Sequence, residues 1–200
     1  MNYTEIKDEA LAKLNNNWGT AILALLIVIA ISMASSFIPF ASILISGPFS
    51  LGMAGIYLKI SRGWKPDING VFDGFKQFGN AIGASILIGL IVLLGCLLLI
   101  VPGIIAALAL SQTYRIMHDN PQMSITDAMQ KSHDMMKGHR GDYFIFNLSF
   151  IGWALLCILT LGLGFLILGP YVATSNSIYY NKLSGYMNQD IEQIGTELVN

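Results

Sequence analysis

Residues 77–114 read QFGNAIGASILIGLIVLLGCLLLIVPGIIAALALSQTY, a stretch of 38 residues without a single Asp, Glu, Lys or Arg. One helix crosses the hydrocarbon core of a bilayer with about 20 residues, whereas a straight helix of this stretch would be about 57 Å long, nearly twice the core. The stretch must therefore fold back on itself. Pro102-Gly103 predicts where it turns, because proline ends helices and glycine tolerates turn conformations.

Two further blocks lack charged residues, 14–58 with 45 residues and 143–181 with 39. The first carries turn signals at Pro39 and Gly47-Pro48, and the last at Gly162, Gly164 and Gly169-Pro170. Three hairpins give six spans, which we predict over residues 18–38, 47–61, 79–100, 103–118, 143–161 and 165–183. Five spans with one re-entrant segment is the alternative.

The composition agrees with a membrane protein. Of 200 residues, 54% are hydrophobic and only 12% are charged, whereas soluble domains carry about 25% charged residues. We expect an all-α polytopic transmembrane bundle that forms one integral membrane domain over residues 1–200. The net charge of −1 gives no excess of basic residues for nucleic acid, so we expect no nucleic-acid partner.

The positions of the charges predict the topology. All eleven Lys and Arg residues lie outside the proposed hairpin tips: Lys7, Lys13, Lys59, Arg62, Lys65, Lys76, Arg115, Lys131, Lys137, Arg140 and Lys182. Cytoplasmic loops carry the Lys/Arg excess, so the tips face outward and both termini lie in the cytoplasm. Residues 1–17 contain three acidic residues, which indicates a retained anchor rather than a cleaved signal peptide.

A polar segment with apolar residues at helical spacing precedes each block. The apolar residues are Ile6, Ala10, Leu11 and Leu14 in the first, Ile68, Val71, Phe72 and Phe75 in the second, and Ile125, Ala128 and Met129 in the third. Ser124 with Asp127 resembles a capping box. Such helices lie in the membrane interface, which predicts three repeat units over 4–62, 67–118 and 124–183. Duplication alone also produces repeats, and the polar tail 184–200 lies outside them.

Two basic clusters flank the spans on the cytoplasmic side. Arg62 and Lys65 surround Trp64 after the second span, and Lys137 and Arg140 open the fifth. Cations beside an interfacial tryptophan suit anionic headgroups. We therefore predict that Arg62, Lys65, Lys137 and Arg140 contact anionic lipid; the simpler interpretation is that they only set the topology.

Polar residues within the spans are small or amidic: Ser111-Gln112-Thr113, Asn147 with Ser149, and TSNS at 174–177. Their ordinary role is hydrogen bonding between helices. The functional interpretation is a polar cavity open to the cytoplasm and lined by Gln112, Asn147 and Asn176. No charged residue is expected at mid-membrane depth, which argues against an ion-coupled pump. We expect the aliphatic part of the Arg115 side chain to extend far enough for its guanidinium to reach the lipid headgroups.

The sequence indicates no catalytic or metal site. His118, His133 and His139 show no HExxH or Cys/His metal spacing, and Cys96 and Cys157 lie in apolar runs, as packing thiols do. No Ser-His-Asp order, phosphate loop or carboxylate pair is recognisable. We expect no cofactor and no enzymatic activity.

Four strings then stand out in order: LIVPGII at 99–105, Lys131-Ser132 with MKGH at 136–139, LSFIGW at 148–153 and Gly169-Pro170-Tyr171. Together they resemble the bacterial integral membrane family catalogued as domain of unknown function 975, over residues 10–183. The resemblance implies a multi-pass bacterial cell-membrane protein and no established activity. More loosely, the chain is similar to membrane domains attached to some glycerophosphodiester phosphodiesterases, but it has no such catalytic domain.

Two functions follow from these observations. The first is a non-enzymatic membrane protein that binds or organises membrane lipids or protein partners through its cytoplasmic face. The alternative is a carrier or permease for a small or amphiphilic solute, with its site among the three units. A cavity near mid-depth would favour the carrier, and a closely packed bundle would favour the binding protein.

Overall fold

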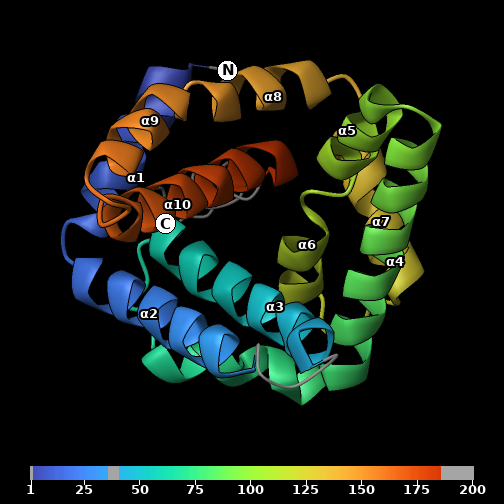
Figure 1. Cartoon of the computed structure of the whole chain (residues 1–200), viewed down its shortest axis with the longest axis horizontal. Helices are drawn as coiled ribbons and strands as arrows, with labels where there is room; N and C mark the ends of the chain where they lie inside the picture. Colours follow the sequence, from blue (N-terminus) through green and yellow to red (C-terminus); the bar gives the residue numbers. More distant parts are fainter. Residues whose placement is uncertain (1, 36–40, 186–200) are drawn as a thin grey trace, which may run out of the picture.

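A computed structural model describes residues 2–35 and 41–185, and these residues form helices without any strand. The all-α prediction is confirmed for this part of the chain (Figure 1). The helices are α1 (Tyr3–Leu14), α2 (Trp18–Ser35), α3 (Ala41–Ser61), η1 (Ile68–Gln77), α4 (Phe78–Leu98), α5 (Ile100–Ala109), α6 (Thr113–Asp119), α7 (Ile125–Met135), α8 (Arg140–Leu148), α9 (Ile151–Leu159) and α10 (Phe165–Ser184).

The helices form an inner and an outer set. Figure 1 shows α3, α6 and α10 in the interior, with α2, α4, α8 and α9 around them. Burial follows the same division. In α10, residues 174–181 are all buried, whereas Ala21 and Ala24 are the buried residues of α2 and Ala81 and Ala84 those of α4. Small alanines on the inward face let each outer helix approach the interior closely.

Four helical segments in the described residues are long and apolar enough to cross a membrane: Trp18–Ser35, Ile68–Leu98, Ile100–Asp119 and Arg140–Leu159. Their outward faces expose large aliphatic side chains, such as Leu23 at 55%, Leu93 at 58% and Ile158 at 62%. Exposed apolar surface of this extent suits lipid rather than water. The four segments do not include α3 or α10, so six spans in three hairpins stay a prediction.

The three polar segments are helical where we expected them, as α1, η1 and α7. In α1, Ile6, Ala10 and Leu14 are fully buried, while Leu11, expected on the same face, is 45% exposed. In α7, half of the predicted capping box is present: Ser124 Oγ accepts the Asp127 N–H at 3.1 Å. The Asp127 carboxylate accepts from the Ser124 hydroxyl at 2.6 Å, whereas in a full capping box it would accept from the Ser124 backbone N–H. Such a cap satisfies a backbone donor that the first turn leaves unpaired.

Segment η1 is a 3-10 helix of 10 residues, which is long for this geometry. It packs directly on the backbone of α3. A Cβ atom on Gly74 would overlap the carbonyl oxygen of Pro48, and a Cβ atom on Gly52 would overlap that of Val71. The two glycines therefore set how closely η1 and α3 approach.

Two of the predicted turn signals are wrong. Gly47-Pro48 lies inside α3 and Gly169-Pro170 inside α10. Proline is tolerated within such helices because neighbouring groups satisfy the carbonyl that it frees. Pro39 lies outside the described residues.

The other two turn signals lie at or beside real turns. The chain turns at Leu99, just before the predicted Pro102-Gly103, with extended backbone (φ −165, ψ 151). It also turns at 160–164, as Gly162 and Gly164 predicted, where Leu161 and Gly162 have φ of 54° and 88°. Pro102 occupies the first turn of α5, where its missing N–H costs nothing. Both turns are apolar and open, with Leu98 at 78% and Leu161 at 96% exposure. They are named the apolar tips below.

Two predicted spans, 103–118 and 143–161, are each interrupted. Between α5 and α6, the fully buried Ser132 of α7 repairs the break: its Oγ donates to the Ala109 carbonyl at 2.8 Å and accepts the Gln112 N–H at 3.2 Å. Between α8 and α9 the break falls at 149–150. Buried backbone groups need such partners because no water replaces them.

The three repeat units stay a prediction, but the inner helices of the first and third share a pattern. Each has Gly-Pro, a tyrosine nine residues after the proline, and a terminal glycine six residues later: Gly47-Pro48, Tyr57 and Gly63 match Gly169-Pro170, Tyr179 and Gly185. Gly63 and Gly185 adopt φ of 79° and 73°, a left-handed conformation that ends helices and favours glycine. The tail beyond residue 185 lies outside the described residues.

Candidate functional site

A cluster of charged and polar side chains joins the ends of the three inner helices. The Arg62 guanidinium, 8% exposed, donates two bonds to the Asp119 carboxylate at 2.8 and 2.6 Å. Tyr180 donates to the same carboxylate at 3.0 Å. Arg62 also donates to Asn181 at 3.3 Å, and Asn181 donates to Ser61 at 2.9 Å. These five residues are named the clasp.

The clasp uses the best geometry available to an ion pair, because a guanidinium matches a carboxylate with two parallel bonds. It links residues 57 positions apart in the sequence. Arg62, which we predicted to contact headgroups, thus forms hydrogen bonds with residues of α6 and α10. The clasp is a structural connection between α3, α6 and α10.

Near the clasp lies a wide, open recess of about 680 Å³, named the inner cavity. Its walls come from α8, α9 and α10 and are mostly apolar, with Leu148, Ile151 and Leu168 among them. Leu148 and Ile151 are about half exposed, at 47% and 55%, so the cavity opens sideways between the outer helices. Ligand cavities of about 300–1,000 Å³ commonly have this apolar character.

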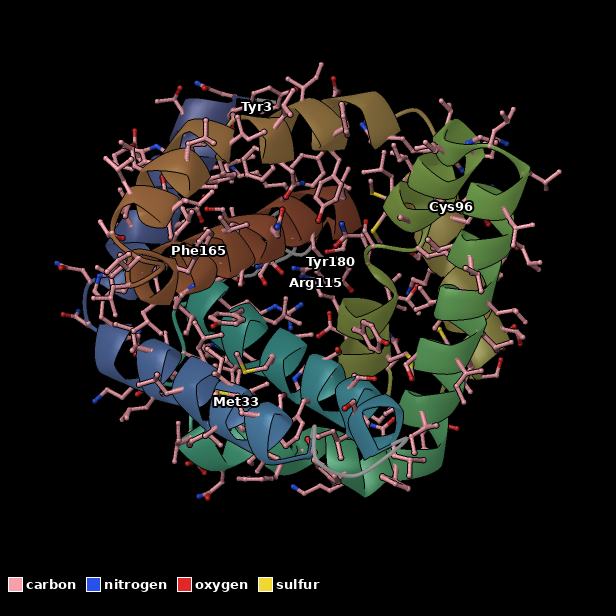
Figure 2. All side chains as sticks on the ribbon, viewed as in Figure 1. Tyr3, Met33, Cys96, Arg115, Phe165 and Tyr180 are labelled. Atoms are coloured by element: carbon pink, nitrogen blue, oxygen red, sulfur yellow. The ribbon has the colours of Figure 1, made fainter. Side chains whose placement is uncertain are left out.

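The inner cavity has a polar end formed by Arg115, Asn147 and Asn176. Figure 2 shows Arg115 and Tyr180 in the middle of the molecule, far from Met33 and Cys96. Arg115 donates to Ser177 Oγ at 3.3 Å and to Gln112 Oε1 at 3.0 Å. The Arg115 side chain therefore points into the protein, whereas we expected it to extend toward the lipid headgroups. No carboxylate of residues 2–35 or 41–185 lies within 4.0 Å of it.

The structure brings together two of the three residues predicted to line a polar cavity, Asn147 and Asn176, and places Gln112 outside the lining. Asn176 donates to Asn147 Oδ1 at 3.1 Å, and both line the cavity. Gln112 is fully buried, and its Oε1 accepts a hydrogen bond from the Arg115 guanidinium. Asn176 is 9% exposed, and its Oδ1 has no hydrogen-bond partner. A buried acceptor without a partner is costly, so it marks a place where a donor fits.

A second groove, of about 670 Å³, lies between α4, α5 and α7 and is named the outer groove. Leu87, Ile91 and Ile105 form its apolar wall, and its polar end carries His133 and Arg140. Arg140 Nη2 lies 3.3 and 3.2 Å from the two ring nitrogens of His133. Its Nε is buried without a partner, and no carboxylate of the described residues pairs with it.

The other predicted headgroup residues lie outside this groove. Lys137 is exposed in the connection between α7 and α8, and Lys65 is exposed after α3. The structure thus divides the four predicted cations: Arg140 lies at a groove, Arg62 in the clasp, and the two lysines at the surface. The outer groove itself was not expected, because its wall combines residues of α4 and α5 with the polar rim of α7.

Within the described residues, no three His, Cys, Asp or Glu side chains lie close enough to hold a metal ion. Cys96 is exposed and Cys157 is buried, and neither forms a disulfide. The candidate sites are therefore the two grooves, each with an apolar wall and a cation at one end. A surface of this kind can hold an amphiphile by its chain and its anionic head.

Comparison with known proteins adds the family. Residues 96–186 match the model of a family described as protein of unknown function (DUF975). This part of the chain is similar to DUF975. The resemblance predicted from the sequence is thereby confirmed over the matched residues, which run from the end of α4 to the end of α10. Searches of curated proteins and of solved structures found no match. The DUF975 region contains Arg115, Arg140 and both asparagines of the inner cavity.

Proposed function

We propose that this chain is a multi-pass protein of the bacterial cell membrane that binds anionic lipid without catalysing a reaction. The observation that carries the proposal is the outer groove, where an apolar wall ends at an arginine without a carboxylate partner. Its occupant is a phospholipid whose acyl chain lies along α4 and α5 and whose phosphate contacts Arg140. Membrane lipids are then its first partners.

The proposed topology follows from the charges and the apolar tips. Both termini lie in the cytoplasm, with α1, η1 and α7 at the inner interface and the tips on the outer side. In this orientation Arg140 lies at the level of the cytoplasmic headgroups. Anionic lipids give that surface its negative potential, so the groove would meet its ligand where the ligand is enriched.

Thiol labelling tests this topology. In a protein with Cys96 and Cys157 replaced by serine, Leu163→Cys is expected to react with a membrane-impermeant maleimide in intact cells. Lys131→Cys on α7, which is exposed, should react only after the cells are permeabilised. The reverse pattern would overturn the orientation, and labelling of both sites in intact cells would overturn the six-span arrangement.

Substitution of Arg140 tests the outer groove. Arg140→Gln is expected to weaken binding of phosphatidylglycerol roughly tenfold or more, because a hydrogen bond to a charged group is worth about 1.5–3 kcal/mol. Native mass spectrometry of the protein with a defined series of lipids measures the affinity. Lys131→Gln is the matched control, since it removes the same charge from the exposed surface of α7. Equal losses in the two variants would show that only net charge matters.

One observation favours a carrier as the second candidate. The inner cavity lies beside the breaks between α5 and α6 and between α8 and α9, and its polar end lies between them. Interrupted helices flank the substrate sites of many transporters. Uptake or flip of a labelled lipid in proteoliposomes would favour this function. Lipid binding without any transport would contradict the carrier and support the first proposal, a protein that only binds lipid.

A further inference from the structure

We infer that the inner cavity is a second lipid site, and that it selects a phospholipid whose headgroup carries both an anionic phosphate and a hydrogen-bond donor. The site is separate from the outer groove, because it is built by α8, α9 and α10 with Arg115 of α6. Its ligand class follows from what its polar end lacks, namely an anion for Arg115 and a donor for Asn176.

The need for an anion comes from the environment of Arg115. The guanidinium lies within a candidate membrane-spanning segment, Ile100–Asp119, and its hydrogen-bond partners Ser177 and Gln112 are neutral. A cation within a span is costly unless an opposite charge compensates it. The carboxylate of Asp119 is already bound by Arg62 and Tyr180. A phosphate in the cavity would compensate Arg115.

The need for a donor comes from Asn176. Its amide group donates to Asn147, and the Asn147 amide donates in turn to the Tyr143 carbonyl at 2.8 Å. This chain fixes the orientation of both amides and leaves Asn176 Oδ1 as a buried acceptor without a partner. A headgroup hydroxyl would complete it. A bare phosphate diester has no proton to donate there.

The walls indicate a membrane lipid rather than a water-soluble phosphate. Apart from the polar end, the lining is apolar, and Phe144, Leu148 and Ile151 are each exposed by 43% or more on the outer surface of α8 and α9. A lipid could enter sideways through this opening from the bilayer. Its acyl chain would then cover surface that is otherwise open.

The experiment compares two lipids with identical acyl chains and one negative charge each. Phosphatidylglycerol carries headgroup hydroxyls, and phosphatidylmethanol carries none. Binding is measured by native mass spectrometry in the Arg140→Gln background, so that the outer groove does not contribute. We expect phosphatidylglycerol to bind roughly fivefold or more tightly, because an unpaired buried acceptor costs about 1–3 kcal/mol.

Two substitutions then separate the two requirements. Arg115→Gln is expected to weaken both lipids roughly tenfold or more. Asn176→Leu, which keeps the volume of the side chain, is expected to abolish the preference while phosphatidylmethanol still binds, and that residual binding also shows that the variant is folded. Unchanged affinity in Arg115→Gln would overturn the site, and an unchanged preference in Asn176→Leu would overturn the donor requirement. If the outer groove proves not to bind lipid, both results are unaffected, because every measurement is made in the Arg140→Gln background.

Discussion

Asp119→Asn is expected to destabilise the protein by about 2 kcal/mol, because hydrogen bonds to charged groups are worth about 1.5–3 kcal/mol. Arg62, at 8% exposure, would lose the carboxylate that it contacts through two bonds, and Tyr180 would lose its acceptor. Unfolding titrations in mixed detergent micelles measure the change. The junction of α3, α6 and α10 is where the loss is expected, since there the clasp adds to the apolar packing of Leu58, Ile116 and Tyr180.

The matched control is Asp134→Asn, which removes the same charge from an exposed side chain that accepts from Gln130. Its effect should stay within about 0.5 kcal/mol, as for most surface substitutions. Combining Arg62→Met with Asp119→Leu should recover much of the lost stability, because both charges of the pair are then removed together. A double variant less stable than Asp119→Asn would show that the clasp acts through its neutral hydrogen bonds instead.

Gly52→Ala is expected to destabilise the protein by about 2 kcal/mol or more, although alanine is the better helix former, because overpacking forces the backbone apart. The added methyl group would overlap the carbonyl oxygen of Val71 in η1 and would lie 2.9 Å from that of Gly70. These are backbone atoms, so no side-chain rotation can relieve the contact. The same unfolding titrations measure the loss.

Gly89→Ala in α4 is the matched control, since nothing lies within 4 Å of the Cβ atom that it adds. It should stabilise the helix, by up to about 1 kcal/mol, through the propensity of alanine alone. The two substitutions are chemically identical and differ only in what the methyl group meets. Equal stability of the two variants would mean that η1 does not pack on the backbone of α3 as described.

The sequence predicted the helices well, because their main signal is local. Ionised side chains avoid hydrocarbon, so Lys13 and Lys59 bracket the first apolar block, and Ser124 with Asp127 marks the start of α7. The signals that failed were the Gly-Pro pairs at 47–48 and 169–170. Proline breaks an isolated helix, but helices packed on all sides can satisfy the freed carbonyl, and only the fold shows which case applies.

The candidate sites could be predicted only in part, for the same reason. Asn147 and Asn176 were recognisable as polar residues in apolar runs, and the structure does bring them together. The pairing of Arg62 with Asp119, across 57 residues, and the meeting of Arg140 with the wall of α4 and α5 depend on tertiary contacts. A single sequence contains no local pattern for either. The shared Gly-Pro, tyrosine and glycine spacing of α3 and α10 was a signal that could have been found.

In the proposed topology, the apolar tips bear on how the chain inserts into the membrane. Neither tip carries an ionisable group: residues 97–101 read LLLIV and residues 159–164 read LTLGLG. A hairpin of this kind can be inserted as a pair of helices without moving charge through the bilayer, so the electrical component of the proton-motive force does no work on it. In the proposed topology, biogenesis of these two hairpins should then proceed in de-energised cells.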